Sequence, residues 1–306
     1  MYVARPPMGW NSWNTFGENI DESLIRETAD AMVDTGLRDA GYTYLVIDDC
    51  WSQKERGPQG DLRADERKFP NGMKAVADYV HSKGLKFGMF SCDGVLTCAG
   101  FPGRYGHEFQ DARTFAEWGV DFLKYDNCYK TKSMNGELLY RRMSMALKAS
   151  GRDILFSACG GGASNPGTGC GARAICTVHG DIQDTESVRN IAESQVDKLC
   201  CSAPGCFNDL DMLVVGMYES EMGVGGCNDA EYRSFPMGVY LAYPMIGCDI
   251  RNMTPQTASL LNKVITSIRT RGSSTYVLTG PGTSKVEPMF FGTYPAVSAP
   301  WLIQSD

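Results

Sequence analysis

Short runs of apolar residues recur along the chain, and segments with a helical repeat of apolar positions lie between them. Runs of β-branched and aromatic residues predict strands, whereas apolar residues spaced three or four positions apart predict amphipathic helices. Eight candidate strands result, at residues 8–13, 44–49, 86–91, 121–126, 154–159, 174–178, 212–215 and 239–246. Helices are expected at residues 21–40, 72–83, 108–118, 136–149 and 185–199. Asp21 is the expected N-cap of the first helix.

Strands that alternate with helices are typical of a parallel sheet. Eight such units in about 260 residues favour a closed (β/α)8 barrel, or TIM barrel, over an open doubly wound sheet. A Gly-x-Gly-x-x-Gly motif does not follow the first strand, which weighs against a dinucleotide-binding fold. We therefore predict an α/β protein with a TIM barrel over residues 1–262. A short β-rich segment follows over residues 263–306, with strand-like pieces at 275–278 and 289–293.

Polar side chains gather where the candidate strands end. In a parallel barrel all the carboxyl ends of the strands meet at one rim, which is where active sites are built. Acids, a lysine and an aromatic at one rim form an anionic pocket with an aromatic wall, which suits a sugar. The residues concerned are Trp13, Asp48, Asp49, Ser91, Lys124, Asp126, Cys159, Asp181, Asp209 and Asp211.

The stretch FLKYDNC, residues 122–128, places two opposite charges on one strand face. Side chains two residues apart in a strand point to the same side, so Lys124 and Asp126 share that face. One interpretation is a structural ion pair. The other makes Asp126 a carboxylate nucleophile that Lys124 keeps ionised, because a nearby positive charge lowers the pKa of a carboxyl group.

A glycosidase also needs a second carboxyl group, which donates a proton to the leaving oxygen. The candidates are Asp181, Asp184, Asp209 and Asp211, and Asp184 also fits the N-cap of the helix at 185–199. Adjacent strand-end aspartates occur in metal sites as well, so Mg²⁺ or Ca²⁺ at Asp48 and Asp49 is an alternative interpretation.

Composition excludes several other functions. The net charge is −7 and no Lys/Arg run stands out, so we expect no nucleic-acid partner. Every apolar stretch is shorter than the roughly 20 residues that span a bilayer, so we expect no membrane partner. The chain has only three histidines, which weighs against a mechanism based on histidine.

Cysteine usage points to an oxidising compartment. The chain has 12 cysteines without a Cys-x-x-Cys pair, which favours disulfides and buried thiols over a zinc site. Asn252 also begins a glycosylation sequon. We therefore expect a secreted protein or one in another oxidising compartment, although the N-terminus shows no signal-peptide hydrophobic region. The oligomeric state stays open.

Several stretches resemble glycoside hydrolase family 27, the family of α-galactosidases and α-N-acetylgalactosaminidases. The matching segments run in collinear order from about residue 6 to residue 260 and are long and family-specific. They are PPMGWNSWNTFG, YLVIDDCW, FPNGMKAVADYVHSKGLKFGMFS, GHEFQDARTFAEWGVDFLKYDNC, FNDLDML and IGCDIRNMTP.

The resemblance implies a role for each matching residue. Asp126 corresponds to the catalytic nucleophile and Asp181 to the general acid/base. Asp48 and Asp49 correspond to residues that bind the 4- and 6-hydroxyls of galactose. The remaining substrate-binding positions that the resemblance implies are Trp13, Lys124, Cys159, Asp211 and Met212. It also implies retaining hydrolysis of an α-galactoside, with no cofactor and no metal.

The chain departs from the family pattern around the 2-position of the sugar. Gly160 and Gly161 stand where family members usually have a glutamate and a tryptophan, and Thr177 stands where they have an arginine. Three interpretations follow. The pocket accepts a 2-N-acetyl group, or it holds galactose through other contacts such as Arg173 or His179, or the protein binds sugar without hydrolysing it. Galactose is our first choice because Asp48, Asp49 and Lys124 are all present; transglycosylation would use the same residues.

Two further points rest on the resemblance. Cys98 and Cys128 match a family disulfide, while Glu18 replaces the usual partner of Cys50. After about residue 261 the family usually carries a β-sandwich, so the β-rich segment here corresponds to a truncated or reduced form of that domain.

Overall fold

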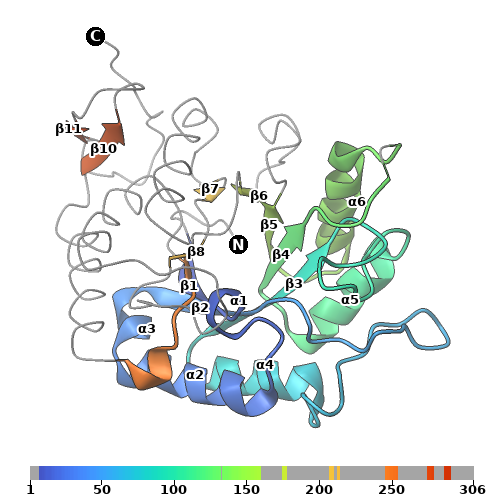
Figure 1. Cartoon of the computed structure of the whole chain (residues 1–306), viewed down its shortest axis with the longest axis horizontal. Coiled ribbons are helices and arrows are strands. Elements are labelled where there is room, and N and C mark those ends of the chain that lie inside the picture. The colour runs from blue at the N-terminus through green and yellow to red at the C-terminus, as the bar shows by residue number, and fades with distance from the viewer. Residues whose placement is uncertain are drawn as a thin grey trace.

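The computed structural model describes residues 7–131, 133–159, 174–177, 207–209, 212–213, 245–253, 274–278 and 286–290. Its centre is one parallel sheet with helices packed on the outside (Figure 1). The strands are β1 (Met8–Asn11), β2 (Tyr42–Ile47), β3 (Lys86–Cys92), β4 (Phe122–Asp126), β5 (Leu155–Cys159), β6 (Ala174–Thr177), β7 (Phe207–Asp209), β8 (Met212–Leu213) and β9 (Met245–Ile246). Their order in the sheet is β7-β6-β5-β4-β3-β2-β1-β9-β8.

The sheet closes on itself. Strands β7 and β8 lie at opposite ends of the order, yet only residues 210 and 211 separate them in sequence. Consecutive Cα atoms are about 3.8 Å apart, so the two ends of the sheet lie within roughly 11 Å of each other. The nine strands therefore occupy eight positions of a ring. This arrangement confirms the barrel predicted from the alternation of strands and helices.

The helices agree with the predicted segments, with one correction. The described helices are α1 (Trp13–Phe16), α2 (Glu22–Asp34), α3 (Leu37–Ala40), α4 (Gly72–Ser82), α5 (Glu108–Trp118) and α6 (Gly136–Ala149), with a 3-10 turn at Ile250–Asn252. The single helix expected at 21–40 was wrong, because Gly36 takes a left-handed φ of 77° and separates α2 from α3. The Asp21 N-cap is confirmed, since its carboxylate accepts a hydrogen bond from the Leu24 N–H at 2.8 Å.

Four of the predicted barrel segments extend beyond the described residues. The helix at 185–199 lies outside them, as do residue 178 of the sixth strand, residues 214–215 of the seventh and residues 239–244 of the eighth. Near the C-terminus, β10 (Ser274–Leu278) and β11 (Val286–Phe290) form an antiparallel pair, in agreement with the expected β-rich segment. The division into domains at residue 262 stays a prediction. In the described part of the chain, none of the helices has the length and apolar character needed to cross a bilayer.

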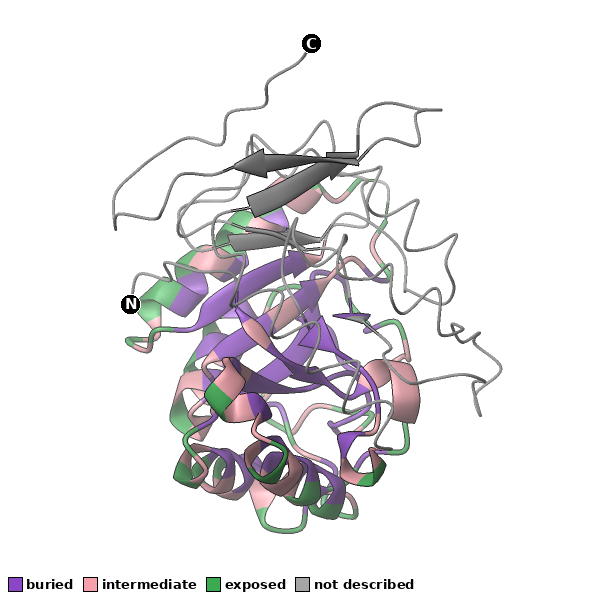
Figure 2. Cartoon of the chain, turned by 90° about the vertical axis from the view of Figure 1, so that its left-hand side faces the viewer, coloured by how far each residue is buried: buried purple, intermediate pink, exposed green. Residues whose placement is uncertain are grey.

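The core lies inside the barrel and between the strands and their helices (Figure 2). Trp10 is fully buried, and its indole Nε1–H donates to the Cys248 carbonyl at 2.8 Å. On the helix side of β4, the ring of Tyr125 packs 5.5 Å from that of Tyr140 on α6 and 5.4 Å from that of Phe156 on β5. These contacts anchor the strands whose ends carry the polar residues.

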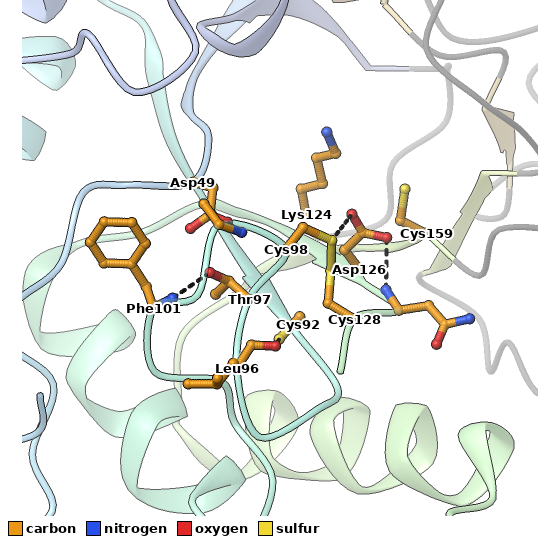
Figure 3. The surroundings of a disulfide bond; sticks show 12 residues. Asp49, Cys92, Leu96, Thr97, Cys98, Phe101, Lys124, Asp126, Cys128 and Cys159 are labelled. Atoms are coloured by element: carbon orange, nitrogen blue, oxygen red, sulfur yellow. Dashed lines mark hydrogen bonds between the residues drawn. A yellow bond between two sulfur atoms is a disulfide. The ribbon is translucent and has the colours of Figure 1, made fainter. Parts of the chain in front are cut away.

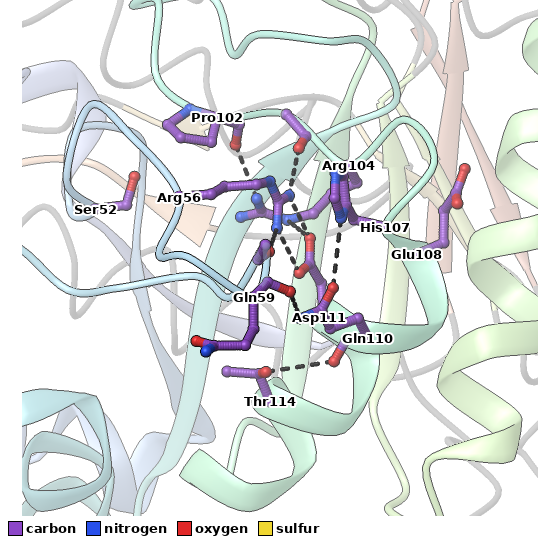
Figure 4. A network of polar contacts seen from close by, with 12 residues as sticks. Ser52, Arg56, Gln59, Pro102, Arg104, His107, Glu108, Gln110, Asp111 and Thr114 are labelled. Carbon is purple, nitrogen blue, oxygen red and sulfur yellow. Dashed lines mark hydrogen bonds and ion pairs between the residues drawn. The ribbon is translucent and has the colours of Figure 1, made fainter.

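A buried network of charges ties the loop after β2 to α5 (Figure 4). The guanidinium of Arg56 binds both carboxylate oxygens of Asp111, at 2.9 and 2.7 Å. Nε of Arg104 lies 3.3 Å from the same carboxylate, and its Nη1 donates to the Pro102 carbonyl at 2.8 Å. Asp111 and Arg104 are both buried, so we refer to Arg56, Arg104 and Asp111 as the α5 network.

Candidate active site

The carboxyl ends of the first five strands meet at one rim, as the parallel register requires. Asp126 at the end of β4 is aligned with Cys92 of β3 and with Cys159 of β5. Asn11, the last residue of β1, is aligned with Val46 of β2, two residues before Asp48. The polar residues identified in the sequence are therefore neighbours in the fold wherever the structure describes them.

Asp48 is held by donors from three directions. Its Oδ2 accepts from the Lys124 ammonium at 2.9 Å and from the Asn11 amide at 2.8 Å. Its Oδ1 accepts from the Asp49 N–H at 2.8 Å. The carboxylate is almost fully buried, so these bonds compensate for the loss of water around its charge.

Asp49 is equally buried but is bound by backbone groups. Its carboxylate accepts from the Cys50 N–H at 2.7 Å and from the Ala99 N–H at 3.0 Å. Burial raises the pKa of Asp49 above its ordinary value of 3.8, and the N–H donors together with Thr97 oppose that rise. Neighbouring aspartates thus sit in different environments. The N–H and ammonium donors at both carboxylates favour the sugar-site interpretation over the metal interpretation.

Successive side chains of β4 point to opposite faces of the sheet, as the sequence predicted. Tyr125 packs against the helices, while Lys124 and Asp126 on the opposite face are only partly buried. The ion pair of Lys124 joins it to Asp48, beyond the end of β2, at 2.9 Å. Lys124 therefore links two strand ends across β3, whereas its proposed influence on Asp126 stays a prediction.

Asp126 lies beside a disulfide (Figure 3). Cys98 and Cys128 are bonded, as the family resemblance implied. The Cys98 sulfur is 3.8 Å from Oδ2 of Asp126, while Oδ1 accepts from the Asn127 N–H at 2.7 Å. Both sulfurs are bonded to each other, so the close group Cys98, Asp126 and Cys128 has no thiolate to offer a metal.

The loop that carries Cys98 passes very close to the chain after β4. A Cβ atom added to Gly94 would lie only 1.7 Å from the Cys128 carbonyl oxygen, so only glycine fits there. The Asp93 N–H donates to the Asp126 carbonyl at 2.9 Å. The same loop supplies the Ala99 N–H that binds Asp49. One loop thus contacts two of the predicted site residues.

Three further predicted residues are described. Trp13 begins α1 at the rim and is partly buried, and its N–H donates to the Asn11 side-chain oxygen at 2.9 Å. Cys159 ends β5 beside Asp126 and is a half-buried cysteine that is not disulfide-bonded to any described residue. Met212 lies buried in β8.

The other sequence predictions at the site lie outside the described residues. These are Asp181, Asp184, Asp211, Gly160, Gly161, Arg173 and His179. The backbone of Thr177 pairs with that of Cys159 where β5 and β6 end.

Sequence reasoning missed Asn11 and the donors of residues 97–99. Asn11 had a visible signal in the sequence, because it is a polar residue at the end of the apolar run MGW. In the structure its side chain is 1% exposed. The Ala99 N–H had none, since a backbone donor in a loop leaves no trace in the residue types. Cys50, next to Asp49, also takes a positive φ of 70°, an unusual conformation for a residue other than glycine.

Known proteins resemble this chain over most of its length. A sequence model of the family described as "Alpha galactosidase A" matches residues 5–270. Alpha-galactosidase 2 of Arabidopsis thaliana is 48% identical over 272 residues, which cover 87% of this chain and 67% of that protein. An alpha-galactosidase of Oryza sativa subsp. japonica is 46% identical and covers 84% of this chain and 61% of its own length.

Solved structures agree with the sequence relatives. An alpha-galactosidase of Saccharomyces cerevisiae superposes with a TM-score of 0.78 at 33% identity, over 89% of this chain and 66% of its own. Alpha-galactosidase I of Mortierella vinacea gives a TM-score of 0.77 at 33% identity, over 91% and 76%. The chain thus spans about two thirds of the length of most of these proteins.

Proposed function

The chain belongs to the alpha galactosidase A family, and from that premise we propose that it is a retaining glycoside hydrolase that cleaves terminal α-linked galactose from oligosaccharides or glycoconjugates. One observation carries the proposal: within a chain of this family, Asp48, Asp49, Lys124 and Asp126 converge at the carboxyl ends of neighbouring strands. That is where a TIM barrel performs its chemistry.

The reaction has two displacements. The Asp126 carboxylate attacks the anomeric carbon, and the bond to the leaving oxygen breaks as Asp181 protonates that oxygen. Asp181 then removes a proton from water, which attacks the same carbon and releases the sugar from Asp126. The Asn127 N–H donates to Oδ1 of Asp126 at 2.7 Å and holds the carboxylate in place.

The sugar is held by the buried aspartates and their lysine. Asp48 and Asp49 accept hydrogen bonds from the 4- and 6-hydroxyls, and Lys124 donates to an oxygen of the same ring. Trp13 offers an aromatic face to the sugar, while Cys159, Asp211 and Met212 complete the pocket. Because Asp48 and Asp49 are already held by protein donors, little reorganisation accompanies binding.

A second candidate is α-N-acetylgalactosamine as the sugar. Gly160, Gly161 and Thr177 are small where the family carries larger side chains, which would make room for a 2-N-acetyl group. A protein that binds sugar without hydrolysis is the third candidate, although the presence of both Asp126 and Asp181 argues against it.

The test is hydrolysis of 4-nitrophenyl α-galactoside and of the matching α-N-acetylgalactosaminide, side by side. We expect faster turnover of the galactoside. Faster turnover of the N-acetyl substrate would assign the second candidate. No detectable hydrolysis of either substrate would contradict the proposal that the protein hydrolyses one of these sugars.

Two variants test the assigned carboxylates. Asp126→Asn and Asp181→Asn should each abolish turnover without unfolding the protein, whereas Asp184→Asn, at the predicted helix N-cap, is the matched control and should stay active. Full activity in either of the first two variants would refute the mechanism.

We also propose that the protein works in an oxidising compartment, as a secreted enzyme or an organellar one. The Cys98–Cys128 disulfide supports this, because such bonds persist mainly outside the cytosol.

A further inference from the structure

Asn11 is a buried polar residue that the proposed reaction does not use. It ends β1 at the rim and is 1% exposed. A buried amide is costly unless its donor and acceptor are both satisfied. In Asn11 both ends are used, and each binds a residue of the proposed sugar pocket.

The donor end of Asn11 faces Asp48. Nδ2 donates to Oδ2 of Asp48 at 2.8 Å, while Lys124 reaches the same oxygen from β4 at 2.9 Å. The Asp49 N–H holds the other oxygen. Donors from β1, β4 and the chain after β2 therefore determine both the position and the plane of the Asp48 carboxylate.

The acceptor end of Asn11 faces Trp13. Oδ1 accepts from the Trp13 N–H at 2.9 Å, at the first residue of α1. The same amide thus joins the residue proposed to accept a sugar hydroxyl to the residue proposed to lie against the sugar ring.

We propose that Asn11 is a positioning residue that aims the Asp48 carboxylate at a single hydroxyl of the sugar and sets the aromatic wall beside it. The inference rests on the proposed function. The residue type follows from the geometry: an aspartate would place a second negative charge beside Asp48, a leucine would make neither bond, and a serine is too short to make both.

The experiment combines Asn11 variants with substrates that lack one hydroxyl. The enzymes are wild type, Asn11→Leu and the control Asn14→Ala. Asn14 is an asparagine three residues along, whose side-chain oxygen has no hydrogen-bond partner among the described residues. The substrates are 4-nitrophenyl α-galactoside and its 4-deoxy and 6-deoxy analogues, with kcat and KM measured for each pair.

We expect Asn11→Leu to lower kcat/KM on the galactoside by about 10- to 100-fold, the effect of misplacing one hydrogen bond to a charged group. On the analogue that lacks the hydroxyl bound by Asp48, the loss should shrink to less than about threefold, because the contact that Asn11 positions is already absent. The other analogue should show the full loss, and Asn14→Ala should show no substrate-dependent loss.

An equal loss on all three substrates would overturn the inference, because a merely structural role affects every substrate alike. An unchanged kcat/KM would overturn it too. If Asn11→Leu fails to fold, Asn11→Asp carries the same test, since it keeps the size and the acceptor for Trp13. A wild-type protein that is inactive on the galactoside would instead overturn the proposed function, and this inference with it.

Discussion

Two regions of this molecule each contain a buried aspartate paired with a basic side chain. In the α5 network the Asp111 carboxylate lies between the guanidiniums of Arg56 and Arg104, and the side chain is 0% exposed. At the rim the Asp48 carboxylate has one cation, Lys124, whose side chain is 15% exposed. The side chain of Arg56 is 14% exposed, so the two groups differ in the number of cations at the carboxylate and in their place in the fold, and not in the exposure of the outer cation.

The two carboxylates differ in the donors that bind them. Arg56 binds both oxygens of Asp111 in a bidentate pair, and Arg104 adds a second cation, which saturates the site with protein donors. Asp48 is bound by one ammonium and two neutral N–H groups at the end of a strand. Burial therefore does not mark a functional charge, because both carboxylates are buried and each has one partly exposed partner. The position at the carboxyl end of a strand is what sets Asp48 apart.

The largest expected effect comes from Asp111→Asn. The substitution leaves the buried Arg104 guanidinium and the partly exposed Arg56 guanidinium facing an uncharged amide, so we expect the free energy of unfolding to fall by about 3–5 kcal/mol. Urea unfolding measures the change. Specific activity of the folded fraction should stay close to wild type, because the charged partners of Asp111 are Arg56 and Arg104, which are not residues of the proposed pocket.

Asp48→Asn is the matched variant for that comparison. It should cost less stability, because one partly exposed cation loses its charged partner and not two cations of which one is fully buried, but it should lower kcat/KM about 10- to 100-fold. If Asp111→Asn proved the more harmful to activity and Asp48→Asn the more harmful to stability, the distinction between the two regions would be wrong.

The disulfide should give the next largest effect. Replacing both Cys98 and Cys128 with serine removes a cross-link between residues 30 positions apart, which the chain-entropy model values at about 3.6 kcal/mol. Activity should fall as well, because the loop that it anchors contacts both Asp49 and Asp126. Thermal unfolding and KM for the galactoside measure the two consequences.

Cys92→Ser is the control for that pair. Its side chain is a buried free thiol that contacts the Leu96 carbonyl at 3.0 Å, a bond that serine retains. We expect it to cost less stability than the double variant. Equal losses in the two proteins would show that buried packing, and not the cross-link, holds this loop.

The smallest expected effect concerns the pH dependence of stability at the rim. Burial raises the pKa of Asp49 in the folded protein above 3.8, so the folded state binds this proton more tightly than the unfolded chain does. Its contribution to stability is fully present below pH 3.8 and is lost as the pH rises through the folded-state pKa. Asp49→Asn lacks this proton linkage.

Urea unfolding of wild type and Asp49→Asn between pH 3.5 and 7 measures the effect. Relative to the variant, the wild type should lose stability as the pH rises, by about 1.4 kcal/mol for each unit of pKa shift. The N–H donors of Asp49 offset part of the cost of burial, which keeps the change small. A relative gain in stability with rising pH would contradict the assigned direction.

The sequence alone predicted the barrel and the alternation of side chains between the two faces of β4. Alternating strands and helices imposed the parallel order, and the two-residue repeat placed Lys124 and Asp126 on one face. It was insufficient for the break in the first helix, where the left-handed φ of Gly36 overrode the helical pattern. A glycine inside an amphipathic run is compatible with either outcome.

The candidate site divides in the same way. Strand-end position identified Asp48, Asp49 and Asp126, because one rim collects them all. The hydrogen-bond and ion-pair partners of these residues could not be predicted from the sequence. Lys124 reaches across β3 to Asp48, and Asp49 accepts a hydrogen bond from a loop 50 residues away. Such contacts depend on three-dimensional register and loop path, which residue types alone do not encode.

Closure of the strand ring also bears on how the protein behaves in a crowded solution. A strand at the edge of an open sheet exposes unpaired N–H and C=O groups that can recruit another chain and start aggregation. The described nine-stranded sheet ends in two short strands, β7 of three residues and β8 of two, and short edge strands are poor templates. The β10–β11 pair has longer edges, because both strands have five residues and each pairs on one side only in the described part of the chain. Self-association through main-chain hydrogen bonds is therefore directed to the C-terminal strands and away from the barrel.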